Sequence, residues 1–389
     1  MKTHSLRLLT KTSFSVTCLL CATGAFAAPS MPADVLGNFE PGTQLNRTQE
    51  MFDRQKTIEQ IEKNAHKDLR TKKPAANAHP ARSVPEVSFL LKGLELDASE
   101  VLTKEELNRI TNAYIHRKVR LVELYELVDK INDLYSEKGF VTCRAILPPQ
   151  RIHNGIVKVR LIEGKTGKVH ISNNPHTNDG YIRNRLSLDE GAIVNISRLN
   201  EDITRFNGTN DVQLQVALKA GEAVGTTDYE IVAIEPPKNQ DFRIYADTNG
   251  YENNSRYRYG LMYTNRSVTG RRDVLTFSYL RSRGSDILGF AYSAPIASSA
   301  TRAEISAGYN SNKVVNGYME PLGVKGKAYN VGMALRHPLV IQEDFRAELS
   351  VEYMHQESQT DLFVKTSDKV RWVDGKTDKF TFSGAFTHY

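Results

Sequence analysis

Apolar and polar positions alternate through the last part of the chain, residues 237–389. Gly, Asn, Asp and Ser divide this part into segments of about ten residues, which is the length of a strand that crosses a membrane. Strands of soluble β-sandwiches usually have about 5 or 6 residues. The pattern therefore predicts an antiparallel transmembrane β-barrel, and a soluble β-sandwich is the alternative.

Charged side chains occupy one face of these alternating segments. A charge that faces lipid destabilises a membrane strand, so this face is predicted to line a water-filled lumen. Solvation of the pore is the simplest role for these side chains, and contact with a substrate is the alternative. The predicted pore-lining residues are Arg258, Glu304, Arg336, Glu348 and Glu352.

Upstream, apolar residues recur at a spacing of three and four, which is typical of amphipathic helices. One such helix begins near residue 121 and ends at Gly139. A strand over residues 141–147 follows it. Two prolines, at positions 148 and 149, end the strand because proline donates no backbone hydrogen bond.

Two consecutive units share this organisation. Residues 87–164 have the predicted order β-α-α-β-β, with a helix that opens at Thr103 and carries Glu106 three residues later, as in a capping box. Residues 165–236 repeat the order in a shorter form. Small open sheets of this kind leave an unpaired strand edge that another peptide can join. The repeat therefore predicts a modular α+β arm that binds an extended partner.

The first residues have the features of a secretory signal peptide. A basic start precedes an apolar stretch over residues 14–26, and Ala25-Phe26-Ala27 is a small-x-small cleavage signature. The predicted leader is therefore residues 1–27, and the mature chain is expected to begin near Ala28.

A mostly polar helix is predicted over residues 46–71, within an amino-terminal segment that spans residues 28–71. Two interpretations are open for it: a solvated helix, or a helix that lies inside a water-filled space. Residues 72–86 contain prolines among alanines and basic residues, which is typical of an extended linker. Leader, helix and linker thus precede the α+β arm.

Composition narrows the functional classes. The 389-residue chain has a net charge of +6 and a pI near 9.0, but its basic residues are scattered, so nucleic acid is not an expected partner. Of the three cysteines, Cys18 and Cys21 lie in the predicted leader, so the mature chain is expected to have no internal disulfide. Cys143 lies on a predicted strand, where a cysteine is typically a small buried hydrophobe.

Motifs of catalysis and cofactor binding are absent from the sequence. It contains no G-x-S-x-G nucleophile elbow, no H-E-x-x-H metal motif and no G-x-x-x-x-G-K-[ST] phosphate loop. We therefore predict no catalytic residue, no metal ligand, no cofactor and no small-molecule substrate.

Several short motifs resemble one known family. Residues 124–164 contain Leu-Tyr, Lys-Gly-Phe, Leu-Pro-Pro-Gln and Ile-Glu-Gly in this order. This run resembles the first POTRA domain of the haemolysin activation/secretion family, the outer-membrane transporters of two-partner secretion. Residues 247–267 and the Tyr-Ser-Ala-Pro at residues 292–295 are similar to the start of the family's barrel. The resemblance covers nearly all of the mature chain.

The resemblance implies a plug helix at residues 46–71, POTRA domains at residues 87–164 and 165–236, and part of a barrel at residues 237–389. It implies a bacterial outer-membrane pore whose POTRA domains lie in the periplasm. The implied partners are outer-membrane lipid and the amino-terminal secretion domain of one large exoprotein: a haemolysin, an adhesin or a contact-dependent toxin. A barrel-assembly insertase, or an outer-membrane adhesin or enzyme with a periplasmic arm, is the alternative.

The number of strands departs from the family. Family barrels have about sixteen strands, whereas about eight are predicted here. The half that carries the family's inward-folded loop, with its Val-Arg-Gly-Tyr motif, is not in the sequence. The chain is therefore expected to be a fragment or a truncated gene product that holds the amino-terminal half of the barrel.

The resemblance also implies a partner-binding edge. In a POTRA domain, the strand after the second helix is the exposed sheet edge, to which a substrate can add a strand. Ordinary sheet strands that face water are the alternative interpretation. The candidate partner-binding residues are Thr142, Cys143, Arg144, Ala145, Ile146 and Leu147 in the first unit and Val212, Leu214, Val216 and Leu218 in the second.

Overall fold

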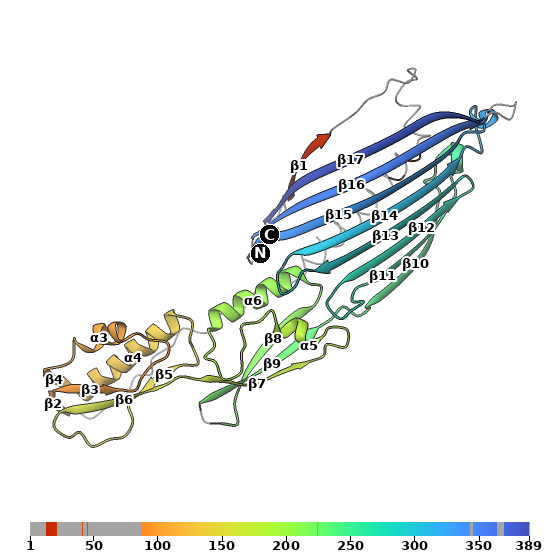
Figure 1. The fold of residues 1–389 in the computed structure, drawn as a ribbon. Coiled ribbons are helices and arrows are strands. Elements are labelled where there is room, and N and C mark those ends of the chain that lie inside the picture. The colour runs from red at the N-terminus through yellow and green to blue at the C-terminus, as the bar shows by residue number, and fades with distance from the viewer. Residues whose placement is uncertain are drawn as a thin grey trace, which may run out of the picture.

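An α+β arm leads into a broad antiparallel sheet (Figure 1). The predicted helix at residues 46–71 and the linker at residues 72–86 lie outside the described part of the chain. Within that part, no helix is both long and apolar enough to span a membrane. The computed structural model describes residues 13–21, 41, 45, 87–223, 225–342, 345–363 and 369–388.

The first α+β unit packs two helices on a small sheet. The capping box expected at Thr103 is present: the Glu106 amide donates to the Thr103 hydroxyl at 3.3 Å, and the Thr103 amide donates to the Glu106 carboxylate at 3.0 Å. The elements are β2 (Ser88–Leu91), β3 (Gly93–Leu96), α3 (Lys104–Thr111), β4 (Arg117–Arg120), α4 (Leu121–Glu137), β5 (Arg144–Ile146) and β6 (Ile156–Ile162).

The apolar face of α4 forms the core of this unit. Leu127, Ile131 and Tyr135 are fully buried and belong to one cluster with Val157 of the sheet. β6 is the central strand, because it pairs in parallel with β3 and antiparallel with β5. β5 therefore lies at the margin of its sheet. The sequence did not predict β4, which pairs antiparallel with β2.

The second unit repeats the arrangement. Asn195 caps the amino-terminal end of α6: its side chain accepts a hydrogen bond from the Arg198 amide at 3.1 Å. The strand order β7-β9-β8 corresponds to β3-β6-β5 in the first unit, so β8 lies at the margin. The elements are β7 (Lys165–Ser172), α5 (Asp179–Arg183), α6 (Ile196–Thr209), β8 (Gln213–Ala220) and β9 (Thr226–Ile234).

Gly139 joins the two units. It has a left-handed backbone with φ of +85° at the end of α4. Its carbonyl accepts a hydrogen bond from the Ile196 amide at 2.8 Å, and the Asn195 side chain donates to the Lys138 carbonyl at 2.9 Å. A Cβ at position 139 would lie 2.5 Å from the Asn195 Oδ1 atom. Glycine therefore permits both the turn and the close approach of α6.

Eight strands, β10 to β17, form the carboxy-terminal sheet, and neighbouring strands are antiparallel. The sheet is not closed: β10 lies at one margin, and beyond β17 the order ends with β1 (Ser13–Cys21). β1 lies within the predicted leader, so cleavage after residue 27 would remove it. The strands are β10 (Gln240–Asp247), β11 (Arg258–Asn265), β12 (Val274–Ser282), β13 (Ser285–Pro295), β14 (Arg302–Lys313), β15 (Lys325–Ile341), β16 (Phe345–Phe363) and β17 (Lys369–His388).

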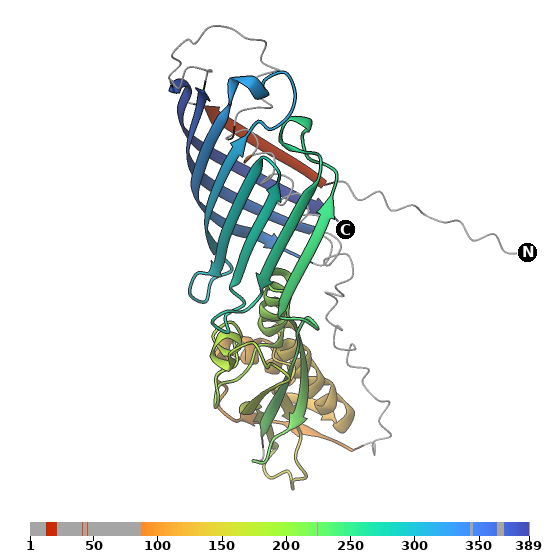
Figure 2. The same cartoon turned by 90° about the vertical axis from the view of Figure 1, so that its right-hand side faces the viewer.

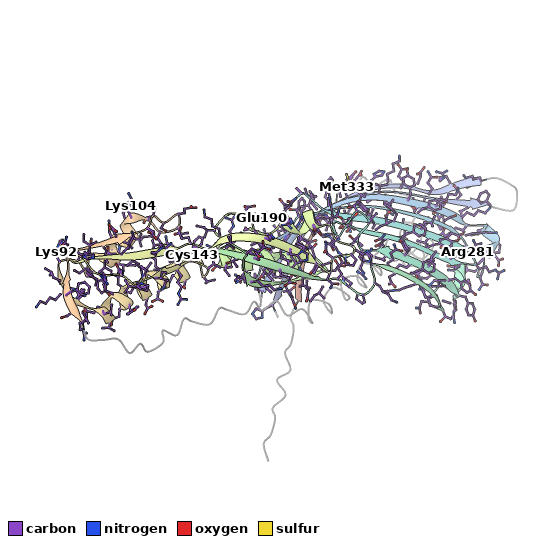
Figure 3. The ribbon with its side chains drawn as sticks, turned by 90° about the horizontal axis from the view of Figure 1, so that it is seen from below. Lys92, Lys104, Cys143, Glu190, Arg281 and Met333 are labelled. Atoms are coloured by element: carbon purple, nitrogen blue, oxygen red, sulfur yellow. The ribbon has the colours of Figure 1, made fainter. Side chains whose placement is uncertain are left out.

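The strand register gives this sheet two different faces. Met333 lies beside Ile305 and Tyr353, whereas Gly332 lies beside Ser306. We call the face of Met333 the outer face and the face of Gly332 the inner face. Met333 is 57% exposed on the outer face (Figure 3). Other exposed apolar residues of the outer face are Ile244, Phe290, Ile305, Val331, Leu335, Leu349, Val351, Phe380, Phe382 and Phe386.

The capping box generates a prediction about pH. A hydrogen bond from Lys138 and another from the Thr103 amide lower the pKa of Glu106 to about 2 from 4.5. Because the folded-state pKa is the lower one, the ionised carboxylate stabilises α3 above pH 4.5, and this contribution is lost as the pH falls towards 2. Glu106→Gln is expected to remove this pH dependence from the amide-exchange protection factors of α3. Glu105→Gln is the control, and equal curves for the two variants would contradict the prediction.

Candidate functional site

The predicted partner-binding residues of the first unit lie in and around β5. The strand is shorter than expected because the Cys143 amide donates to the Phe140 carbonyl at 3.0 Å within a turn. β5 contains Arg144, Ala145 and Ile146, and the residues outside it are Thr142, Cys143 and Leu147.

The predicted residues of the second unit lie along β8, at the margin of the sheet. Val212 precedes the strand and is fully buried. Leu214 is 2% exposed, Val216 is partly buried, and Leu218 is 47% exposed. Among these four residues, the exposure of the side chain therefore increases along β8.

Cys143 is a buried thiol. Its side chain belongs to the core of the first unit, and burial raises the pKa of Cys143 to about 11. A thiol in this state is a poor nucleophile at neutral pH. Cys143 therefore serves as a small side chain that packs in the core of the first unit. No group of three or more residues able to hold a metal ion occurs among the residues that the structure describes.

The five predicted pore-lining residues lie on the inner face of the sheet. Glu304 and Glu352 both pair across the sheet with Ala334. Arg336 approaches Glu304 at 3.8 Å, and Arg258 lies 2.7 Å from Asp247. The fifth residue, Glu348, lies 2.8 Å from Arg346. The face is therefore lined by paired opposite charges, whose partners Asp247 and Arg346 the sequence analysis did not single out.

Two amino-terminal residues, Pro41 and Leu45, also lie against the inner face. Leu45 is 2% exposed and packs with Leu280, Ile287 and Ala328. The Asn310 side chain donates a hydrogen bond to the Pro41 carbonyl at 2.8 Å. Leu280 and Ile287 are apolar positions on an otherwise polar face. This exception in the sequence could have indicated that another apolar residue packs there. The residues just before the predicted helix thus contact the predicted lumen.

A buried arginine joins the second unit to the sheet. Arg272, in the turn between β11 and β12, is 1% exposed. Its Nε and Nη2 atoms donate to the Asp211 carboxylate at 2.8 Å and 2.5 Å, and its Nη1 atom lies 3.9 Å from Glu235. Both acids belong to the second unit and lie at the same end of the β8–β9 pair, where Gln213 is the partner of Ile234. The ion pairs therefore connect the arm and the sheet through a buried guanidinium.

Further turns of the sheet contact the same unit. Arg185 donates to the Ala297 carbonyl in the turn between β13 and β14. Arg346, at the start of β16, donates to the Gly208 carbonyl at 2.9 Å. Figure 2 shows the arm beneath one end of the sheet, with α6 directed towards the strand ends. Successive turns on this side of the sheet therefore rest on the second unit.

Comparison with known proteins defines the class of the arm and the sheet. Residues 89–164 match the family "POTRA domain, ShlB-type". The solved structure of CdiB from Escherichia coli matches with a TM-score of 0.56 and 16% identity over 93% of this chain and 65% of that chain. CdiB from Acinetobacter baumannii matches with a TM-score of 0.53 and 16% identity over 92% of this chain and 69% of that chain. The predicted fold class is thereby confirmed: a POTRA-type arm and an antiparallel sheet of the barrel type.

Curated relatives make the resemblance more specific. The heme/hemopexin transporter protein HuxB of Haemophilus influenzae (strain 86-028NP) is 27% identical over 310 residues, 76% of this chain and 54% of HuxB. The outer membrane transporter CdiB of Dickeya dadantii (strain 3937) is 23% identical over 137 residues, 35% of this chain and 24% of CdiB. The chain thus spans about half the length of HuxB. The resemblance to the haemolysin activation/secretion family is confirmed as homology to these proteins, which are named as transporters.

The buried ion pair generates a prediction about the junction. Arg272→Met leaves Asp211 without its partner, so we expect a loss of about 3 kcal/mol in the free energy of unfolding in lipid vesicles. Arg271→Met, at the exposed neighbouring position, is expected to change it by less than about 0.5 kcal/mol. In a double-mutant cycle with Asp211→Asn, the two losses are expected to be far from additive. Additive losses would show that the pair is not coupled.

Proposed function

We propose that the chain forms part of an outer-membrane pore that exports one large exoprotein in two-partner secretion, with the α+β arm in the periplasm. The observation that supports this proposal most directly is that one face of the sheet is apolar and the other is charged. The outer face exposes Met333 at 57%, Val331 at 52% and Leu335 at 50%, whereas the inner face carries Glu304 and Glu352. Soluble monomers rarely expose an apolar surface of this extent, and lipid is its natural cover.

The named functions of the relatives support the same proposal. HuxB is named as a heme/hemopexin transporter and CdiB as an outer membrane transporter. The arm supplies a place to recognise a partner before it enters the pore, and the junction at Arg272 holds this arm at one end of the strands. We propose that the recognised part is the exoprotein's amino-terminal secretion domain.

We also propose that the amino-terminal segment closes the pore. Leu45 is seated on the inner face, and the predicted polar helix at residues 46–71 follows it directly. A polar helix suits a water-filled lumen, because its surface needs no apolar cover. In this arrangement Leu45 holds one end of the helix in place, and its release opens the path for the partner.

The outer face generates a prediction about membrane stability. Leu335→Arg places a charge among apolar side chains on the outer face, so we expect a loss of about 2–4 kcal/mol in the free energy of unfolding in lipid vesicles. Ala334→Arg places the same charge one residue away on the inner face, where it faces Glu304 and Glu352, so a much smaller loss is expected. Equal losses at the two positions would contradict a lipid-facing outer face.

The plug generates a prediction about conductance. Leu45→Asp places a charge in an apolar contact, so we expect planar-bilayer recordings of the complete gene product to show a larger open fraction. Leu45→Met keeps an apolar side chain of similar volume and is expected to leave the recordings unchanged. Deletion of residues 46–71 is expected to open the pore further. If neither Leu45→Asp nor this deletion raises the conductance, the plug proposal is wrong.

A further inference from the structure

Cross-strand pairs on β14 and β15 change in three steps along the outer face. The pairs nearest the arm are apolar, the next is a pair of tyrosines, and the last two contain three lysines and a serine. Apolar, then aromatic, then charged is the order in which a membrane strand passes from lipid through the interface into water. From the arm outward, the pairs are Ile305–Met333, Ala307–Val331, Tyr309–Tyr329, Ser311–Lys327 and Lys313–Lys325.

The lysines lie at the end of the sheet that is remote from the arm. β14 follows the turn at Ala297, which contacts the second unit, and it ends at Lys313. β15 runs in the opposite direction and begins at Lys325. Figure 2 shows the arm at the other end of these strands. With the arm in the periplasm, the lysines lie at the level of the outer leaflet.

Lys313, Lys325 and Lys327 form one exposed group, which we call the lysine rim. Lys313 and Lys325 are direct partners, and the Cβ atoms of such partners are about 5 Å apart. Lys327 follows on the same face, about 7 Å further along the strand. The ring of Phe363, 4.6 Å from the Lys325 Nζ atom, positions that ammonium group without neutralising its charge. Lysine side chains are flexible, so the three ammonium groups can meet at one point.

Among the residues that the structure describes, no carboxylate forms an ion pair with the lysine rim. The acid nearest along the ladder is Asp361, the partner of Lys325 on β16. Its carboxylate already lies 2.9 Å from Lys369 and 2.7 Å from Arg371. The partners of Lys327 on both neighbouring strands are uncharged. Like charges that face each other destabilise a sheet, so the lysine rim needs an anion from elsewhere.

Other cations at this end of the outer face are neutralised. Lys376 on β17 lies 2.7 Å from Glu357 on β16. Arg281, which Figure 3 shows at the end of the sheet away from the arm, lies 3.5 Å from Asp286 on the neighbouring strand. The lysine rim is therefore an exception on a face where positive charges otherwise have acidic partners.

We propose that the lysine rim binds a phosphate group of a phosphorylated glycolipid of the lipid A type in the outer leaflet. This inference rests on the proposed function, because it requires the outer face to lie in an outer membrane. A phosphate monoester carries nearly two negative charges at neutral pH and three strong acceptor oxygens. One such group can therefore accept a charge-assisted hydrogen bond from each of the three ammonium groups.

The layers beside the lysine rim favour a lipid over a soluble anion. Val331 is 52% exposed and Met333 is 57% exposed, and both lie on the same face of β15 as Lys325 and Lys327. A free phosphate would use only the lysines. A phosphorylated glycolipid would also place its acyl chains against the apolar residues, so one molecule would cover a continuous strip of the strand.

Binding of diphosphoryl lipid A to the complete gene product in detergent, measured by thermophoresis, tests this inference. Lys327→Gln is expected to raise the Kd about fivefold, and simultaneous replacement of all three lysines by glutamine about a hundredfold. Lys376→Gln removes a lysine that Glu357 already neutralises, so its Kd is expected to change less than about twofold. Unchanged affinity in the triple variant, or an equal loss in Lys376→Gln, would overturn the proposal.

Two further ligands separate the sources of the phosphate. Lipid A without its phosphates is expected to bind about a hundredfold more weakly than diphosphoryl lipid A, and replacement of the lysines is expected to leave this weak binding unchanged. Inorganic phosphate, at concentrations that saturate binding of diphosphoryl lipid A, is expected to give no signal, because it cannot cover the apolar strip. If inorganic phosphate binds as tightly as the lipid, the lysine rim takes a soluble anion and the proposal is wrong.

Unfolding by urea in vesicles checks that the variants fold. In phosphatidylcholine vesicles, the midpoint of Lys325→Gln is expected to equal or exceed that of the unmodified chain, because the substitution removes a like-charge contact with Lys313. When one tenth of the lipid is diphosphoryl lipid A, the order of the two midpoints is expected to reverse. The same order in both kinds of vesicle would overturn the proposal.

Conductance recordings are independent of this binding. A pore that conducts normally but does not distinguish diphosphoryl lipid A from lipid A without phosphates refutes the lysine rim and leaves the pore. Binding that depends on the lysines in a chain that forms no pore refutes the pore and leaves the lipid site.

Discussion

The need to pair backbone N–H and C=O groups is the constraint on which this structure depends. In the sheet, β11 to β16 each lie between two strands, as a strand in lipid requires. Water removes this requirement in the arm, where β5 and β8 lie at the margins of their sheets. There Asn132 bonds both backbone groups of Ala145, and Asn207 bonds both backbone groups of Leu214. The same rule thus distinguishes the part that suits a membrane from the part that suits water.

The junction between arm and sheet relies on charge, and this choice has a physical reason. A buried ion pair adds little net stability compared with apolar packing, but it strongly disfavours every arrangement that leaves one charge unpaired. Arg272 is 1% exposed and donates two hydrogen bonds to Asp211. A small rotation of the arm would therefore leave the buried guanidinium without its partner. Such a contact therefore fixes the orientation of the arm relative to the sheet more than it raises the free energy of unfolding. The proposed export function requires such an orientation of the arm relative to the sheet.

Sequence patterns predicted the parts of this structure that repeat along the chain. Alternation with a period of two assigned Arg258 and Glu352 to the same face, and the Thr103–Glu106 spacing located the start of α3. β4 was missed because its four residues, Arg-Lys-Val-Arg, carry no apolar pattern. The Arg272–Asp211 pair joins residues 61 positions apart, and such polar contacts leave no periodic signal. The Asn132–Ala145 contact was missed for the same reason.

Places where an element departs from its own pattern are the informative ones. The inner face is polar, yet Leu280 and Ile287 lie on it and would be exposed to lumen water if nothing covered them. Leu45 covers them, so an exception to the alternation marks where Leu45 packs. On β8 the exception is Leu218, an apolar side chain that lies beyond the core of its unit and is 47% exposed. In each case the unmet requirement has one simple solution, and that solution is another segment of polypeptide.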